Sequence, residues 1–324
     1  MGIDGILNVA KPGGWTSHDV VARLRRVLRE RRIGHAGTLD PMATGVLVVC
    51  VGQATRVVDC LMGAPKQYRA TVLLGQTTAT DDVTGETVAT ADTGAITRAD
   101  VEAALARFVG VIQQRPPAFS ALKVDGRPMY ALARRGVAVE AAEREVHVYG
   151  LTLTEWQPPR FGLLIDCGRG TYVRSLARDV GSALGVGGCL ATLERTRVGR
   201  FRLDDALTVD QIAALAQAGE VGRALGPIDT ALADLPIAWV DSAGERRVSS
   251  GALAKALERP PWSFASDDSP PSTSAEHGGR RRVYSIDGRL IAIAELDRES
   301  GALQPSVTFR DLPATLVSPP REME

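Results

Sequence analysis

Long hydrophobic runs are absent from this sequence of 324 residues. The longest purely apolar segment extends only from Val46 to Val51, whereas a helix needs about 20 apolar residues to cross a membrane. The first residues, MGIDGILNVAKPGG, contain no basic start followed by an apolar stretch, so they do not resemble a secretory signal. Ile6 stands where a myristoylation signal has Ser or Thr. We therefore expect a cytoplasmic protein that has no membrane partner.

Cysteine and histidine are scarce, with four residues of each. The cysteines form no C-x-x-C pair, and a chain of this length can bury a core without disulfide bonds, so we expect free, buried thiols. The histidines show no metal-ligand spacing such as H-E-x-x-H. The sequence also lacks a G-x-x-x-x-G-K-[ST] phosphate loop and a complete dinucleotide-binding fingerprint. An enzyme with this sequence is expected to work through its side chains alone, without a metal or a cofactor.

An excess of charge of either sign is also missing, because 38 Lys and Arg residues balance 38 Asp and Glu residues. The total charge therefore gives no indication of a nucleic-acid partner. The distribution is less even, since the segment 16–32, TSHDVVARLRRVLRERR, is dense in arginine. Its apolar residues recur at helical spacing, and Thr16 or Ser17 can cap the N-terminus of a helix there. The arginine face of this helix is either an ordinary solvated face or a surface that binds phosphates.

Helical and strand patterns alternate along the chain without a repeat, which predicts a mixed α and β fold. A polar segment at 78–92 is typical of a loop or an edge hairpin. Strands are expected at 6–12, 45–52, 66–75, 144–156 and 161–168, and helices at 16–32, 54–63, 97–110 and 171–185. The apolar run over 45–52 is typical of a buried strand, and Thr97 and Asp100 have the spacing of a capping box at the start of the helix 97–110.

The composition changes near residue 230, where a β-rich stretch begins. We expect a larger domain over 1–232 and a small C-terminal domain over 233–324. Within the small domain, VYSIDGRLIAIAEL predicts a hairpin that turns at Asp287 and Gly288. The segment 262–282 is poor in apolar residues and predicts a flexible loop.

The stretch GHAGTLDPMATG, residues 34–45, contains one carboxylate, Asp40, directly before a proline. Pro41 disfavours helical geometry at Asp40, and Gly37 and Gly45 let the chain bend around it. A carboxylate held in this way suits a nucleophile or an acid–base group at a concave site. It equally suits an ordinary Asp-Pro turn, and the spacing alone does not decide between the two.

The longer segment GHAGTLDPMATGVLVVCVGQATR resembles the signature of the tRNA pseudouridine synthase B (TruB) family. Three further segments resemble motifs of that family in the same chain order: LNVAKPGGWTSHDVV, KQYRATVLLGQTTATDD and CGRGTYVRSLARDVG. The likeness covers residues 4–203 well, and VYSIDGRLIAIAELD more loosely resembles the small PUA-like RNA-binding domain of bacterial members. It implies an α+β fold in which the domain 1–232 is catalytic, with a mixed, mostly antiparallel central sheet, flanking helices and a small β-rich C-terminal domain.

The resemblance also implies a reaction that needs no cofactor. The uridine at position 55 of tRNA, in the T loop, leaves the loop's stack and is isomerised to pseudouridine. By the same resemblance Asp40 is the nucleophile and Arg174 pairs with it and orients it. Tyr68 stacks on the target base and is a candidate for removing the C5 proton.

The resemblance implies RNA contacts for four further residues. Tyr172 matches a second ring at the nucleotide, and Leu193 matches an apolar wall of the pocket. His35 matches the residue that replaces the flipped base in the T-loop stack. Lys11, together with the arginine-rich helix, is expected to contact tRNA phosphates.

Other classes of function fit parts of the sequence. The protein could be an RNA-binding module that folds tRNA with little dependence on catalysis. A glycoside hydrolase would need a second carboxylate beside the scissile bond, and no second motif supplies one. Guide-RNA-dependent relatives need partner proteins, whereas here we expect a monomer that binds the tRNA T stem-loop without an obligate protein partner.

Overall fold

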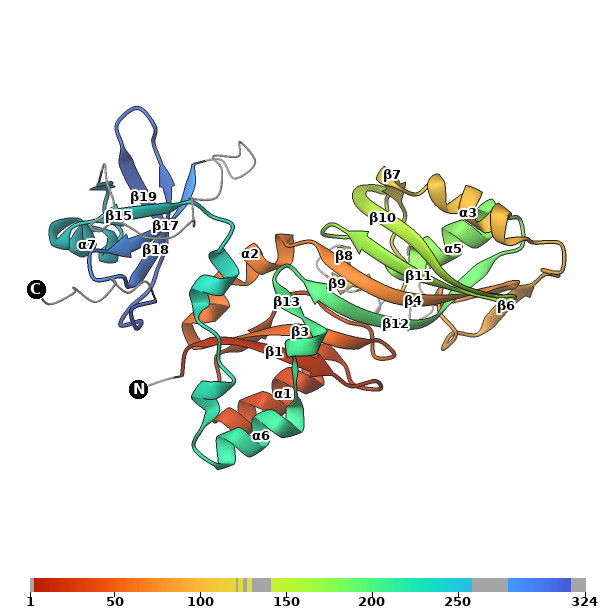
Figure 1. Ribbon diagram of the computed structural model, residues 1–324, viewed down its shortest axis with the longest axis horizontal. Helices are drawn as coiled ribbons and strands as arrows, with labels where there is room; N and C mark the ends of the chain where they lie inside the picture. Colours follow the sequence, from red (N-terminus) through yellow and green to blue (C-terminus); the bar gives the residue numbers. More distant parts are fainter. Residues whose placement is uncertain (1–2, 121, 125–126, 130–140, 258–278, 316–324) are drawn as a thin grey trace, which may run out of the picture.

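The computed structural model describes residues 3–120, 122–124, 127–129, 141–257 and 279–315, and these ranges form two separate main sheets. Figure 1 shows the larger sheet with helices packed around it and the smaller sheet, in blue, at one end of the molecule. The fold class predicted from the sequence, α+β with a small β-rich C-terminal part, is confirmed. In the described ranges no helix is both long and apolar enough to cross a membrane.

The larger sheet is mostly antiparallel, with the strand order β14-β1-β3-β12-β4-β11-β10-β7. Short strands β2 (Ile33–His35) and β13 (Phe201–Arg202) pair with β3 and β12. Among the described strands of this larger sheet, parallel pairing occurs only between β1 and β14 and between β3 and β12. The main strands are β1 (Gly5–Lys11), β3 (Thr44–Val51), β4 (Lys66–Leu74), β7 (Gly110–Gln114), β10 (Arg144–Gln157), β11 (Arg160–Cys167), β12 (Gly188–Val198) and β14 (Leu207–Thr208).

Two pairs of helices cover this sheet (Figure 1). Helices α1 (Ser17–Leu28) and α6 (Val209–Gln217) pack together beside β1. Helices α3 (Arg98–Ala106) and α5 (Val173–Ala183) pack together on the part formed by β4, β10 and β12. Thr16 and Thr97 each cap a helix in a reciprocal capping box, as their sequences indicate.

Helix α1 ends at Leu28, earlier than the pattern over 16–32 predicts. Arg29 adopts a left-handed conformation, with φ of 52°, and terminates the helix. The side chains of two of the arginines form hydrogen bonds with backbone carbonyls. Arg25 donates to the Ile33 carbonyl at 2.8 Å, and Arg32 donates to the Gly52 carbonyl at 2.9 Å. The arginine-rich segment is therefore not one continuous helical face.

Among the remaining short elements, the polar segment predicted as a loop or an edge hairpin forms a hairpin, whereas the helix predicted over 54–63 is divided in two. The segment 78–92 forms an edge hairpin of β5 (Gln76–Thr78) and β6 (Thr87–Thr90). After β3 the chain makes a 3₁₀ turn (Gly52–Val57) and the short helix α2 (Val58–Gly63). Two-residue strands β8 (Lys123–Val124) and β9 (Arg127–Pro128) pair with each other.

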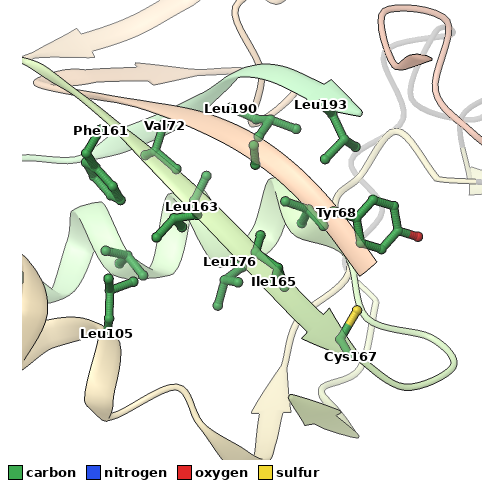
Figure 2. Close-up of a cluster of buried hydrophobic side chains, with 14 of the residues drawn as sticks. Tyr68, Val72, Leu105, Phe161, Leu163, Ile165, Cys167, Leu176, Leu190 and Leu193 are labelled. Carbon is green, nitrogen blue, oxygen red and sulfur yellow. The ribbon is translucent and has the colours of Figure 1, made fainter. Parts of the chain in front are cut away.

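Strand β3 is buried on both faces, as its unbroken apolar sequence predicts. Val46, Val48 and Cys50 pack into the core beneath the smaller sheet, whereas Leu47, Val49 and Val51 pack against α1 and α6. A further cluster, drawn in Figure 2, fills the space between α5, α3 and the strands β4, β11 and β12. Cys50, Cys167 and Cys189 are buried free thiols as expected, and Cys60 is half-buried.

The smaller sheet has the order β15-β17-β18-β19-β16 and carries helix α7 (Ser242–Ser249). The predicted hairpin is present as β17 and β18, and its turn uses Gly288 with φ of 82°. The predicted domain division at 233 stays a prediction; it falls between a 3₁₀ turn (Ile228–Leu232) and β15. Its strands are β15 (Ile237–Val240), β16 (Ala254–Lys255), β17 (Arg280–Ser285), β18 (Leu290–Leu296) and β19 (Ala302–Thr308).

The two sheets share a contact surface. Gln53 donates to the Arg310 carbonyl at 2.8 Å and accepts from the Arg310 backbone at 2.9 Å. Trp239 and Tyr284 of the smaller sheet pack in one apolar cluster with Val46 and Val48 of the larger sheet. Of the expected loop 262–282, residues 280–282 begin β17, and 262–278 lie outside the described residues.

Candidate active site

The segment 34–45 leads from the end of β2 through a loop at 36–43 into β3, and backbone contacts fix the course of this loop. The Gly14 N–H donates to the Pro41 carbonyl at 2.8 Å. The Leu39 N–H donates to Ser17 Oγ at 2.8 Å, and the Ala43 N–H donates to the Asp40 carbonyl at 3.1 Å. These bonds hold the backbone on both sides of Asp40.

Arg174 forms a two-pronged ion pair with Asp40 across 134 residues of sequence. Its Nε lies 2.8 Å from Asp40 Oδ2, and its Nη2 lies 2.9 Å from Asp40 Oδ1. The side chain of Arg174 is 5% exposed and that of Asp40 is 31% exposed. Of the two partners, only the carboxylate is therefore accessible to a ligand. A fork-to-fork contact of this kind fixes the orientation of the carboxylate as well as its charge.

The guanidinium of Arg174 is itself held by three further groups. It donates to the carbonyl of Thr80 at 3.0 Å and to the carbonyl of Phe119 at 2.9 Å. Asp82 Oδ2 lies 3.7 Å from its Nη1. Asp82 is in turn fixed by hydrogen bonds from the Thr80 and Thr84 hydroxyls. The turn between β5 and β6 therefore braces Arg174 from the side opposite Asp40.

A pocket of about 350 Å³ opens over Asp40. Five of the residues predicted from the sequence line it together: Asp40, Tyr68, Tyr172, Arg174 and Leu193. His35 and Lys11 are not among the lining residues. The other lining residues are Gly37, Thr38, Leu39, Met62, Lys66, Ser120, Leu122, Arg144, Arg169, Gly170, Thr171, Val173 and Arg195.

Tyr68 lies on β4 at the border between the apolar core and the pocket. Figure 2 shows its ring beside the cluster, with the hydroxyl directed away from the other labelled side chains. Burial raises the pKa of the Tyr68 phenol, although the charge of Arg195 opposes the shift. The phenol is therefore protonated near pH 7.

Tyr172 lies directly before α5, and its backbone is held from both sides by Gln114. Its N–H donates to Gln114 Oε1 at 2.8 Å, and its carbonyl accepts from Gln114 Nε2 at 3.1 Å. The guanidinium of Arg144 lies over the Tyr172 ring, 4.9 Å from its centre. Leu193, on β12, belongs to the same apolar cluster as Tyr68.

Lys11 has a different position from the phosphate contact predicted for it. Only 1% of the residue is exposed, and its ammonium donates to the carbonyls of Pro12 at 2.8 Å and Trp15 at 2.6 Å. The Pro41 carbonyl is 3.4 Å away. Burial is the main cause that lowers the pKa of Lys11 to about 8. In this structure Lys11 holds the loop next to Asp40 and is too deeply buried to meet a phosphate on the surface.

His35 is the last residue of β2 and is half-buried outside the pocket lining. Burial is the largest cause that lowers the pKa of its imidazole, with smaller contributions from the charges of Arg195 and His18. Its Nδ1 is buried and has no hydrogen-bond partner within the described part of the chain. The ring is therefore neutral near pH 7.

No group of three or more His, Cys, Asp or Glu side chains that could hold a metal occurs among the described residues. The pocket instead combines one carboxylate with cationic and aromatic side chains.

Comparison with known proteins identifies the family. Residues 25–173 match the profile "TruB family pseudouridylate synthase (N terminal domain)", and residues 174–233 match "tRNA pseudouridylate synthase B C-terminal domain". A tRNA pseudouridine synthase B of Thermobifida fusca is 43% identical over 94% of this chain and 98% of its own length. That of Moorella thermoacetica is 43% identical over 91% of this chain and 95% of its own length.

The chain belongs to the TruB family.

A solved structure also supports the fold of this TruB-family chain. A Cbf5-Nop10-Gar1 complex contains a chain that is 26% identical, with a TM-score of 0.69 over 94% of this chain and 85% of that one. The boundary between the two matched family profiles falls directly before Arg174. The Asp40–Arg174 pair therefore joins a residue matched by the first profile to a residue matched by the second.

Arg195 is a part of this TruB pocket that sequence reasoning missed as a functional residue. It is 1% exposed, and it donates to the carbonyls of Val46 at 2.7 Å and Gly37 at 3.0 Å. Gly37 and Val46 flank the loop that contains Asp40, so Arg195 ties both ends of that loop to β12. In the sequence, Arg195 stands between charged and polar neighbours, Glu194 and Thr196, with Arg197 two residues further on, and this pattern by itself indicates no buried role.

We expect Gly45→Ala to disturb this support of the TruB loop. Gly45 has φ of +104°, and an added Cβ would lie 2.3 Å from the Arg195 carbonyl oxygen. The strain and the clash should lower the free energy of unfolding by about 3 kcal/mol and displace Asp40, with loss of activity. Urea unfolding and turnover measure both effects. The control is Gly14→Ala, which has φ of +82° but open space around the new Cβ, and equal effects of the two changes would contradict this explanation.

Lys66 is a second missed residue of the TruB pocket. It is 7% exposed, and its ammonium donates to the carbonyls of Met62 at 2.8 Å and Ala64 at 2.6 Å. Burial, with help from the nearby charge of Arg195, lowers the pKa of Lys66 to about 8.

This pKa predicts how stability changes with pH. Between the folded pKa of about 8 and an unfolded value of about 10.5, the unfolded chain binds a proton that the folded chain has released, so folding gains stability as pH rises. Unfolding wild type and Lys66→Met in urea at pH 7.5 and pH 9.5 compares them across this window. From pH 7.5 to pH 9.5, the free energy of unfolding of wild type minus that of Lys66→Met should increase by an amount on the order of 1 kcal/mol. An unchanged difference would contradict the lowered pKa.

Proposed function

We propose that this chain is a tRNA pseudouridine synthase that isomerises the T-loop uridine, position 55 of tRNA, with Asp40 as the nucleophile. The substrate class follows from the curated relatives, which carry the name tRNA pseudouridine synthase B and align along nearly the whole chain. The observation that carries the residue assignment is the two-pronged Asp40–Arg174 pair inside the pocket.

The reaction fits a site with one fixed carboxylate. The N1–C1′ bond of the nucleotide breaks, the uracil turns, the C5–C1′ bond forms, C5 loses a proton and N1 gains one. Atoms and electrons balance within the nucleotide, so the isomerisation requires no oxidant or reductant. Asp40 attacks the nucleotide at the base or at the sugar carbon and is released when the product forms. Arg174 keeps the attacking oxygens in a fixed direction.

The pocket walls fit a flipped uracil. Tyr68 offers a ring to stack on the base, and Leu193 closes the apolar side. We assign the removal of the C5 proton to Tyr68 because its side chain lines the pocket, with Arg195 as the group that opposes the rise of its pKa. Tyr172 contacts the nucleotide from the α5 side.

His35 is proposed to act outside the pocket. A neutral imidazole can stack in the T loop in place of the base that has left, and this would offset part of the cost of flipping. Lys11 is proposed to position the Asp40 loop through the Pro41 carbonyl.

The direct test is to incubate an unmodified tRNA transcript with purified protein, without added metal, and to separate the nucleosides after digestion. We expect pseudouridine in a transcript with uridine at T-loop position 55 and none when that uridine is replaced by cytidine. Tight binding without conversion would overturn the enzyme assignment and favour the RNA-binding module. Conversion only after partner proteins are added would favour a guide-dependent enzyme. The monomeric state and the cytoplasmic location stay predictions.

A further inference from the structure

The lining of the pocket has an unbalanced charge. It contains five cationic side chains and a single carboxylate, Asp40. Arg174 pairs with that carboxylate, and Lys66 and Arg195 are held by backbone carbonyls. These three side chains already have fixed partners. The two that remain, Arg144 and Arg169, flank Gly170 at the pocket lining.

Arg144 holds the segment 169–172 but keeps an unused donor. Its Nη2 donates to the Gly170 carbonyl at 2.6 Å, and its guanidinium lies over the Tyr172 ring. Its Nε is buried and has no hydrogen-bond partner among the described residues. A buried donor without an acceptor is unfavourable, so an oxygen atom of a ligand that accepts from it would be bound favourably.

Arg169 is exposed, and its guanidinium makes no hydrogen bond or ion pair within the described ranges. Its backbone is joined to Gly170, whose carbonyl Arg144 holds. Both side chains therefore belong to one rim of the pocket, where the bond from Arg144 holds the backbone next to Arg169. Carboxylates do not neutralise either of them within the described part of the protein.

We propose that Arg169 and Arg144 form an anion site at the rim of the pocket, which binds a backbone phosphate next to the flipped nucleotide. This inference rests on the proposed function, because RNA supplies the anion. A guanidinium matches a phosphate with parallel N–H donors, and such contacts position an RNA without reading its sequence. Arg169 contacts the phosphate directly. Arg144 positions the rim and completes the site with its free donor.

The test combines the variant Arg169→Gln with RNA hairpins in which one backbone phosphate is replaced by an uncharged analogue. T-arm hairpins carry a methylphosphonate on the 5′ or the 3′ side of the target uridine. Each is compared with a phosphodiester hairpin that is identical in every other position. On the phosphodiester hairpin we expect Arg169→Gln to raise KM about tenfold, with the single-turnover rate at saturation unchanged. The slope of log Kd against log salt should fall in magnitude by about 0.7 to 0.9, as for one lost phosphate contact. On one of the two methylphosphonate hairpins, wild type and variant should have equal KM.

The controls separate the possible failures. Arg98→Gln removes another exposed arginine, one that pairs with Glu102 on α3 and does not line the pocket, and it should change neither KM nor the salt slope. Arg144→Lys keeps the charge but loses the planar fork, so it should raise KM on the phosphodiester hairpin as well. A tenfold effect of Arg169→Gln that persists on both methylphosphonate hairpins, or no effect at all, overturns the phosphate site. Inactive wild type would instead overturn the proposed function.

Discussion

Arg174→Met is expected to reduce turnover by at least about a thousandfold and to lower the free energy of unfolding by about 3–5 kcal/mol. The methionine fills much of the buried volume but removes every donor of the guanidinium. Asp40 then loses its bidentate partner, the carbonyls of Thr80 and Phe119 lose their donor, and Asp82 faces no cation. Single-turnover rates and urea unfolding measure the two losses.

Two further variants show whether geometry or charge matters at this position. Arg174→Lys keeps the charge but cannot make the two parallel bonds, so we expect an intermediate loss of stability and a rate still reduced about a hundredfold. Arg178→Met is the matched control one turn along α5, because Arg178 pairs with Asp81 and does not line the pocket. It should lower stability and leave the rate within about tenfold of wild type. Equal rate losses at 174 and 178 would contradict a specific role for Arg174.

Asp40→Asn is expected to abolish conversion, with a loss of at least about 10⁴-fold, because an amide is not a nucleophile of comparable strength. The substitution is nearly isosteric, and the amide oxygen can still accept from Arg174, so the pocket should stay folded and RNA should still bind. Nucleoside analysis after digestion and hairpin binding by fluorescence anisotropy separate the two properties. The control is Asp59→Asn, an exposed carboxylate on α2 outside this pocket, which should leave conversion unchanged.

Local elements of this fold were predictable where the residues of a short segment are enough to determine its structure. The apolar run of β3 indicated a strand buried on both faces, and the capping residues Thr16 and Thr97 marked the starts of two helices. The end of α1 was misjudged because Arg29 terminates it by backbone geometry without a glycine. The position of β12 between β3 and β4 could not be predicted, because strand order depends on packing between distant segments.

The active site also depends on contacts between segments that lie far apart in the sequence, and these contacts could not be predicted from local patterns. Asp40 was visible as a carboxylate before a proline, but the same pattern fits a plain turn. Arg174 lies 134 residues away, and only the family resemblance indicated the pair that the structure then placed at 2.8 Å. Lys11 was misjudged because its burial beneath the loop depends on the path of the backbone.

The most direct test of this account is tritium release from a T-arm hairpin that carries uridine labelled at C5, with purified wild type and Asp40→Asn side by side. The account predicts that wild type releases tritium without added metal, and that Asp40→Asn binds the hairpin equally well but releases none. Release by Asp40→Asn at a rate close to that of wild type would contradict the assignment of Asp40 as the nucleophile. No release by wild type, despite tight binding, would contradict the isomerase itself.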